Sequence, residues 1–144
     1  MEENNLFILD ASVLIKWFTG EAEDLEDAIY IRERWEKSLI EIIVPAHCFT
    51  EVINTIGRKY QNIADVTLSE LLNSGIITHL PNLDTGTMAI NLMKKYEKVS
   101  FYDAIYHTLA ISKKGIFITA DERYYNTVKK EGSITLLRDI SRIL

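Results

Sequence analysis

The sequence predicts an α/β protein, a three-layer α/β/α sandwich built on a mainly parallel sheet of about five strands. Five short runs of aliphatic and β-branched residues recur along the chain. Their nearly continuous apolar character is typical of strands that are buried on both faces. The segments between these runs are long enough to form helices. Strands that alternate with helices form βαβ units, which place the strands parallel and cover the sheet with helices.

The expected strands are short, and turn residues separate some of them from the helices. Gly115, for example, fits the turn before the fourth strand. The chain has six glycines and two prolines, and no segment reads as a flexible linker or a repeat. A chain of 144 residues therefore fits one domain over residues 1–144. The strands are expected at residues 6–9, 41–44, 76–79, 116–119 and 134–137.

The intervening segments carry signals for the beginnings and ends of helices. Acidic residues precede the helix expected at residues 25–39 and complement the partial positive charge of its N-terminus. Pro45 fits the first position of a helix that runs to about Tyr60. Gly20 and Gly132 fit helix stops. Further helices are expected near residues 66–73, 85–96, 101–113 and 122–131.

Charge and cysteine content narrow the classes of function. The net charge is −5, whereas a surface that binds nucleic-acid phosphates is usually basic. Any nucleic-acid chemistry would therefore depend on local Lys and Arg and on bound cations. The single Cys48 excludes an internal disulfide and a cysteine-based zinc site. The acidic, polar N-terminus and the absence of an apolar run of about 20 residues predict no signal peptide and no membrane span. We expect a cytoplasmic protein.

Two aspartates follow predicted strands. Asp10 ends the first strand, and Asp121 lies just past the fourth. In parallel sheets, ligands bind outside the carboxyl ends of the strands, at the point where the strand order switches. Both aspartates are therefore candidate site residues. The alternative is that each serves as the N-cap of the next helix, a common role for Asp.

Two further acids lie on predicted helices. Glu51 falls outside the apolar stripe of its helix, in the second turn after Pro45, although a solvated glutamate is an alternative. Ser100 and Asp103 fit a helix capping box. Asp103 also borders an apolar face, with no Lys or Arg one turn away to pair with it. His107 lies one turn further on, and we expect an ordinary surface histidine there.

A cluster of these acids requires a cation. Two carboxylates about 4 Å apart repel by about 4 kcal/mol at an effective dielectric constant of 20. Oxygen ligands without a Cys or His cluster select hard cations, which here means Mg²⁺ or Mn²⁺. Such ions activate a water molecule and stabilise the leaving oxygen during displacement at phosphorus. The pattern therefore predicts metal-assisted phosphoryl chemistry at Asp10, Glu51, Asp103 and Asp121.

Four motifs, in order along the whole chain, resemble the PIN domain and most closely the VapC-type toxins of toxin–antitoxin pairs. They are Asp10-Ala11-Ser12-Val13-Leu14, Glu51-Val52-Ile53-Asn54, Tyr102-Asp103-Ala104-Ile105-Tyr106 and Ile118-Thr119-Ala120-Asp121. The resemblance implies a Mg²⁺- or Mn²⁺-dependent endoribonuclease that cleaves RNA, commonly as a homodimer, and that a cognate antitoxin protein neutralises. It also implies that the four acids bind the metal.

Several other residues are candidates for the site, either because the resemblance implies them or because of their charge. The resemblance implies that Ser12 is a supporting hydroxyl and that Asn54 and Thr119 are polar residues near the acids. Glu122 follows Asp121 directly, and whether it adds a fifth acidic ligand stays open. Lys16 and Arg58 are candidates for RNA contact, although solvated helix ends are an alternative for both.

Three alternatives to a toxin remain at this point. A PIN-fold RNA-processing nuclease would use the same acids, and a non-catalytic PIN-like module would bind RNA or protein without cleavage. A receiver domain or an Asp-x-Asp phosphatase is disfavoured, because Ala11 and Ser12 follow Asp10 where these proteins need further acids, and Arg138 stands where a receiver needs a lysine.

Overall fold

The computed structural model describes residues 5–21 and 23–144. Its core is a five-stranded sheet in the order β3-β2-β1-β4-β5, with every neighbouring pair parallel. The predicted α/β class and strand number are confirmed. The bounds are β1 Leu6–Leu9, β2 Glu41–Pro45, β3 Ile77–His79, β4 Ile116–Thr119 and β5 Ile134–Leu136.

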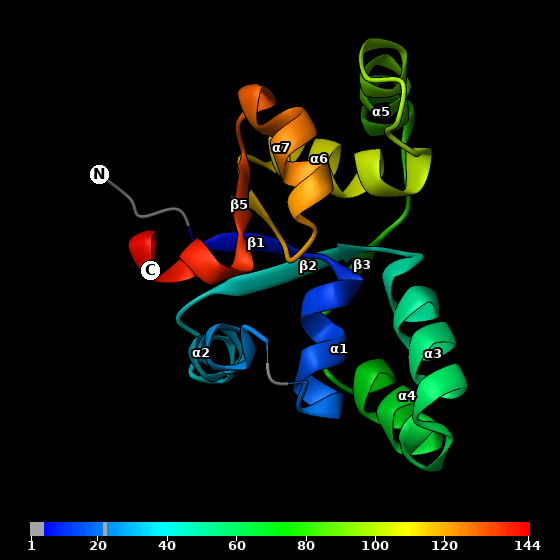
Figure 1. Ribbon diagram of the computed structural model, residues 1–144, viewed down its shortest axis with the longest axis vertical. Coiled ribbons are helices and arrows are strands. Elements are labelled where there is room, and N and C mark those ends of the chain that lie inside the picture. Colours follow the sequence, from blue (N-terminus) through cyan, green and yellow to red (C-terminus); the bar gives the residue numbers. More distant parts are fainter. Residues whose placement is uncertain (1–4, 22) are drawn as a thin grey trace.

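Helices cover both faces of this sheet and form the outer layers of the predicted sandwich (Figure 1). One face carries α1 Ala11–Thr19, α2 Leu25–Glu36, α3 Cys48–Lys59 and α4 Ala64–Leu72. The other face carries α5 Leu83–Lys95, α6 Phe101–Lys113 and α7 Glu122–Val128. Short 3₁₀ segments cover Gln61–Ile63, Lys129–Glu131 and Leu137–Arg142.

Helix α1 was not predicted from the sequence, and α3 begins later than predicted. Six of the nine residues of α1 are buried, and a short, largely apolar run of this kind cannot be assigned to a helix from its periodicity alone. Its end was predicted correctly, because Gly20 caps α1 in the left-handed conformation with φ of 68°. Pro45 closes β2 and does not open α3, which begins at Cys48. The fixed φ of proline suits an extended strand end as well as a first helical turn.

Central strand β1 lies deep in the core. Phe7, Ile8 and Leu9 are at most 1% exposed, and β1 pairs with β2 on one side and with β4 on the other. Burial on both faces explains the unbroken apolar run in the sequence. The position of Asp10, directly after this strand, is therefore fixed by the core of the protein.

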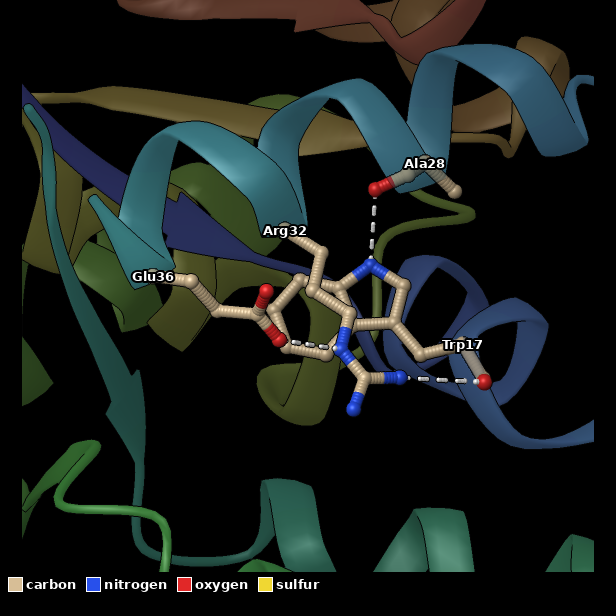
Figure 2. A network of polar contacts seen from close by, with 4 residues as sticks. All are labelled: Trp17, Ala28, Arg32 and Glu36. Carbon is tan, nitrogen blue, oxygen red and sulfur yellow. Dashed lines mark hydrogen bonds and ion pairs between the residues drawn. The ribbon is translucent and has the colours of Figure 1, made fainter.

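The connection between α1 and α2 rests on a tryptophan and an arginine (Figure 2). The indole Nε1 of Trp17 donates a hydrogen bond to the carbonyl oxygen of Ala28 at 2.8 Å. The guanidinium of Arg32 lies over the Trp17 ring, donates to the Trp17 carbonyl at 3.4 Å and pairs with Glu36 at 3.0 Å. Trp17 is 8% exposed and stacks on Trp35, which makes it part of the core.

Two sequence expectations concern the N-terminus and the membrane. The acidic N-terminal segment, on which the expectation of no signal peptide rests, falls mostly in residues 1–4, which are outside the described residues. Among the residues that are described, no helix is both long enough and apolar enough to cross a membrane.

A glycine directly before β4, Gly115, provides a test of the packing against β1. A Cβ atom added at Gly115 would lie 2.8 Å from the backbone oxygen of Leu6 and 3.1 Å from Ile8 Cδ1. Gly115→Ala is therefore expected to lower the free energy of unfolding by about 1–3 kcal/mol, measured by urea denaturation.

The matched control is Gly57→Ala within α3, where an added Cβ meets no atom within 4 Å. Alanine favours a helix over glycine, so this variant should gain about 0.5–1 kcal/mol. Equal stability of the two variants would contradict the close approach at Gly115.

Candidate active site

The candidate site lies where the connections of the sheet change direction. From β1 the chain passes to β2 through helices on one face, whereas β4 passes to β5 through α7 on the other face. This switch of faces falls between the neighbouring strands β1 and β4. Asp10 follows β1 and Asp121 follows β4, so both stand at the carboxyl edge of the sheet beside the switch point.

Thr119 links these two strand ends. Its side chain is fully buried, and its hydroxyl donates to Asp10 Oδ2 at 2.7 Å. The hydroxyl oxygen of Thr119 also accepts a hydrogen bond from the backbone N–H of Asp121 at 3.0 Å. Ser12 supports the same loop, because its hydroxyl accepts the backbone N–H of Ala120 at 3.4 Å.

Asp121 acts as an N-cap through its side chain, whereas Asp10 does not. Asp121 Oδ1 accepts the backbone N–H of Tyr124 at 3.0 Å, so Asp121 caps α7. Asp10 occupies the cap position of α1, but its side chain forms no capping hydrogen bond. Its carboxylate faces Thr119 instead. Asp10 is partly buried, whereas Asp121 is exposed.

Glu51 and Asp103 reach this edge from two helices on opposite faces of the sheet. Because α3 begins at Cys48, Glu51 lies in the first helical turn and not in the predicted second turn. Its Oε1 accepts the hydroxyl of Tyr106 at 3.1 Å. Asp103 lies in the first turn of α6, and its backbone N–H donates to Ser100 Oγ at 3.1 Å, which confirms Ser100 as the N-cap of the predicted capping box.

Electrostatic coupling joins the four acids. The pKa of Asp10 is raised to about 6, chiefly by burial, and the negative charges of Glu51 and Asp103 contribute while the Thr119 hydrogen bond acts in the opposite direction. Burial also raises the pKa of Asp103, as do the charges of Asp121 and Glu51, whereas the Ser100 hydrogen bond lowers it. The charges of Glu51, Asp103 and Asp121 therefore act on the pKa of Asp10, of Asp103 or of both.

The donors fit a hard divalent cation by their chemistry. They are carboxylate oxygens whose charges oppose one another, and a cation would remove that opposition. In the described ranges, however, no three Asp, Glu, His or Cys side chains are already gathered as a metal-binding set.

The other charged residues that were predicted near the site differ in their exposure to solvent. Lys16 is 7% exposed, so the structure contradicts the interpretation of it as a solvated helix end and does not favour it for RNA contact. Arg58 and Asn54 are both exposed, and Arg58 donates to Asn54 Oδ1 at 3.4 Å. Glu122 is exposed and pairs with Arg138.

His107 is buried and not on the surface, which corrects the expectation for it. Its Nε2 lies 2.7 Å from the carbonyl oxygen of Gly132, and its Nδ1 lies 3.1 Å from the hydroxyl of Tyr124. A carbonyl only accepts, so Nε2 carries the proton and Nδ1 accepts from Tyr124. Burial lowers the pKa of His107, which is consistent with a neutral ring.

Two residues that contact Glu51, His47 and Tyr106, were not predicted from the sequence to belong to the site. His47 precedes α3, and its Nε2 lies 3.0 Å from Glu51 Oε1. Tyr106 is fully buried and donates to the same oxygen. The position of His47, two residues after the end of β2, was a signal for it, since that is the carboxyl edge of the sheet. Tyr106 has no such signal, because its position on α6 is typical of a core aromatic residue.

The fold and this cluster define a parallel α/β protein with acids at its switch point. Residues 7–130 match the model of the PIN domain, and the chain belongs to the PIN domain family. Among curated proteins, none matches this sequence.

Solved structures share the fold at low sequence identity. A toxin–antitoxin complex from Klebsiella pneumoniae aligns with a TM-score of 0.65 and 17% identity, over 90% of this chain and 96% of that chain. VapBC2 from Rickettsia felis, bound to a DNA fragment from its promoter, aligns with a TM-score of 0.65 and 10% identity, over 91% and 96%. VapC20 from Mycobacterium tuberculosis, a toxin that cleaves the sarcin-ricin loop, aligns with a TM-score of 0.60 and 15% identity, over 75% and 83%.

The raised pKa of Asp10 predicts a pH-dependent stability. The folded chain holds this proton more tightly than the unfolded chain, whose pKa is near 3.8. The resulting stabilisation is complete below pH 3.8 and is lost as the pH rises through about 6. In a chelating buffer at pH 8, Asp10→Asn should therefore raise the free energy of unfolding by roughly 2–3 kcal/mol.

The check is a series of urea denaturation curves for both proteins between pH 5 and pH 8. The gain from Asp10→Asn should shrink steadily toward pH 5. A gain that does not change with pH would show that the charge of Asp10 is not the cause.

Proposed function

We propose that this protein is a Mg²⁺- or Mn²⁺-dependent endoribonuclease, the toxin of a type II toxin–antitoxin pair. The observation that carries the proposal is the electrostatic coupling of Asp10, Glu51, Asp103 and Asp121 at the carboxyl edge of a PIN-domain sheet. The fold shared with toxins supports it, as does the cleavage of the sarcin-ricin loop by VapC20. The protein acts as one domain over residues 1–144 in the cytoplasm.

In this proposal the four acids hold the divalent ion. Bound there, the ion would neutralise the carboxylates, attract the RNA phosphate and activate a water for attack at phosphorus. The chain prepares this site before any ion arrives. Thr119 holds one oxygen of Asp10. Tyr106 holds one oxygen of Glu51, and capping fixes Asp121 at the start of α7.

Because the site and the chain as a whole are acidic, positive charge for binding RNA must come from elsewhere. The chain carries a net charge of −5, so attraction of the RNA backbone depends on the bound ion and on a few cations. Arg58 is the predicted RNA-contact residue that is exposed. A role for it in holding RNA is part of the proposal.

The proposed partners are the RNA substrate, a cognate antitoxin and a second copy of the chain in a homodimer. Two of the similar structures are toxin–antitoxin assemblies, and this supports the antitoxin. An apolar groove of about 750 Å³ between α3 and α4 offers a place for it. Phe49, Ile53, Leu68 and Leu72 line this groove, and Leu72 is 67% exposed.

Two alternatives share the fold. A PIN-fold RNA-processing nuclease would use the same acids on a different RNA, without an antitoxin. A non-catalytic PIN-like module would bind RNA without cleavage. The coupled acids favour catalysis over the module, because a binding surface alone gives no reason to hold carboxylates against their mutual repulsion.

Loss of a site carboxylate should abolish RNA cleavage. The purified protein is incubated with a mixed RNA pool in Mn²⁺, in Mg²⁺ and in excess chelator, and the products are mapped by sequencing of their ends. Asp10→Asn and Asp103→Asn should each lower the rate roughly 10²-fold or more, because each removes a charge that stabilises the reacting groups.

Asp65→Asn, in the exposed first turn of α4, is the matched control and should retain the wild-type rate. Full activity in chelator, or equal loss in all three variants, would count against the proposed mechanism. RNA that is bound but left intact in the presence of Mn²⁺ would favour the non-catalytic module.

The antitoxin proposal gives a separate expectation about the groove. The product of the adjacent open reading frame, co-expressed with this chain, should co-purify with it and inhibit cleavage. Leu72→Asp should weaken that complex by about 10-fold or more in a titration, because it places a charge in an apolar contact.

Ile90→Asp is the control, since Ile90 is 46% exposed on the opposite face. If both variants bind the antitoxin as the wild type does, the groove is not its binding place. If no neighbouring product binds, the toxin assignment fails and the RNA-processing alternative gains support.

A further inference from the structure

One oxygen of Glu51 is held by a buried tyrosine. The hydroxyl of Tyr106 lies 3.1 Å from Glu51 Oε1 and donates to it. The Tyr106 ring is 0% exposed and stacks on Phe117 of β4, with ring centroids 5.4 Å apart and an interplanar angle of 15°. The hydroxyl is therefore fixed relative to the sheet, and Glu51 is fixed through it.

The second contact comes from His47, at the junction of β2 and α3. Its Nε2 is shielded from solvent and lies 3.0 Å from Glu51 Oε1. Among the described residues, His47 Nε2 has no hydrogen-bond partner, so its contact with Glu51 is one of close approach only. The imidazole packs edge-on against Tyr106 at 5.0 Å and against Tyr102 at 5.7 Å. The ring is thus held beside the carboxylate from two sides.

Both contacts fall on the same carboxylate oxygen of Glu51, so neither occupies Oε2. A glutamate on a helix has three rotatable side-chain bonds and loses entropy when it binds an ion. A buried tyrosine hydroxyl without a partner is costly, which favours a persistent hydrogen bond from Tyr106 to Glu51. Glu51 is therefore restrained before it binds anything.

We propose that Tyr106 and His47 are positioning residues that hold Glu51 ready to bind a divalent cation through its free oxygen. The proposal rests on the proposed function, in which Glu51 is a metal ligand. It explains why the one acid that lies neither at a strand end nor in a capping motif still belongs to the cluster. Groups that orient a metal ligand typically change metal affinity by 10–100-fold when they are removed.

The experiment measures Mn²⁺ affinity of the full-length protein by titration calorimetry and by the electron paramagnetic resonance signal of free Mn²⁺, without RNA. The variants are Tyr106→Phe, His47→Gln, Glu51→Gln and the double variants of each positioning residue with Glu51→Gln. Tyr106→Phe should weaken Mn²⁺ binding about 10-fold, and His47→Gln should weaken it in the same direction. In the Glu51→Gln background neither change should have a further effect.

Tyr60→Phe is the matched control. Tyr60 also donates to a glutamate, Glu21 Oε1 at 3.4 Å, but it does so at the opposite end of α3. It should leave Mn²⁺ affinity unchanged. Circular dichroism and thermal unfolding identify a variant that fails to fold. His47 is only partly buried, so His47→Gln still tests the proposal if Tyr106→Phe does not fold.

The outcomes separate this inference from the proposed function. If wild type and Glu51→Gln bind Mn²⁺ equally or not at all, the role of Glu51 in the proposed function fails. If Glu51→Gln weakens binding but Tyr106→Phe and His47→Gln do not, the positioning proposal is overturned and the metal site stands. Weakening that persists in the Glu51→Gln background would also overturn it, because the effect would not pass through Glu51.

A kinetic measurement gives a second readout. With positioning removed, the Mn²⁺ concentration for half-maximal cleavage should rise in step with the binding constant, and the rate at saturating Mn²⁺ should remain near that of the wild type. A loss of rate at saturation with unchanged Mn²⁺ affinity would contradict a positioning role.

Discussion

The repulsion among four carboxylates is the constraint on which the rest of this structure depends. The fold brings Asp10, Glu51, Asp103 and Asp121 within electrostatic reach of one another at one edge of the sheet, in a chain that is already acidic. Burial adds to the cost, because it removes water that would screen these charges. Such an arrangement lowers the stability of the folded state and is expected where function requires the charges.

Neighbouring groups limit this cost without removing the charge. The hydroxyl of Thr119 stabilises the ionised form of Asp10, and Ser100 does the same for Asp103. The hydroxyl of Tyr106 donates to Glu51. These donors come from a strand, a helix cap and a helix interior, so the site depends on several elements of the fold. Hydroxyl groups leave the carboxylates negative, and the acids thereby remain suited to bind a cation.

An aromatic cluster connects the core to this edge. Phe117 of β4 contacts Tyr106, His107 and Tyr124, and it lies two residues before Thr119 in the same strand. His107 accepts from the Tyr124 hydroxyl, while the Tyr124 backbone donates to Asp121. Packing behind the sheet edge therefore sets the positions of polar groups in front of it. This arrangement gives a physical reason why the aromatic residues of α6 and α7 matter to the site although they carry none of its charge.

The sequence by itself determined the features that depend on local pattern. It predicted the five strands, the parallel sheet and the positions of Asp10 and Asp121 at strand ends. These features could be predicted because each depends on a short apolar run and on the residue that follows it. The tertiary structure alone decided which polar groups that are distant along the chain meet. It buried Lys16 and His107, and it brought Tyr106 to Glu51 from 55 positions away along the chain. Such contacts follow from the packing of whole helices on a sheet, which no short stretch of sequence encodes.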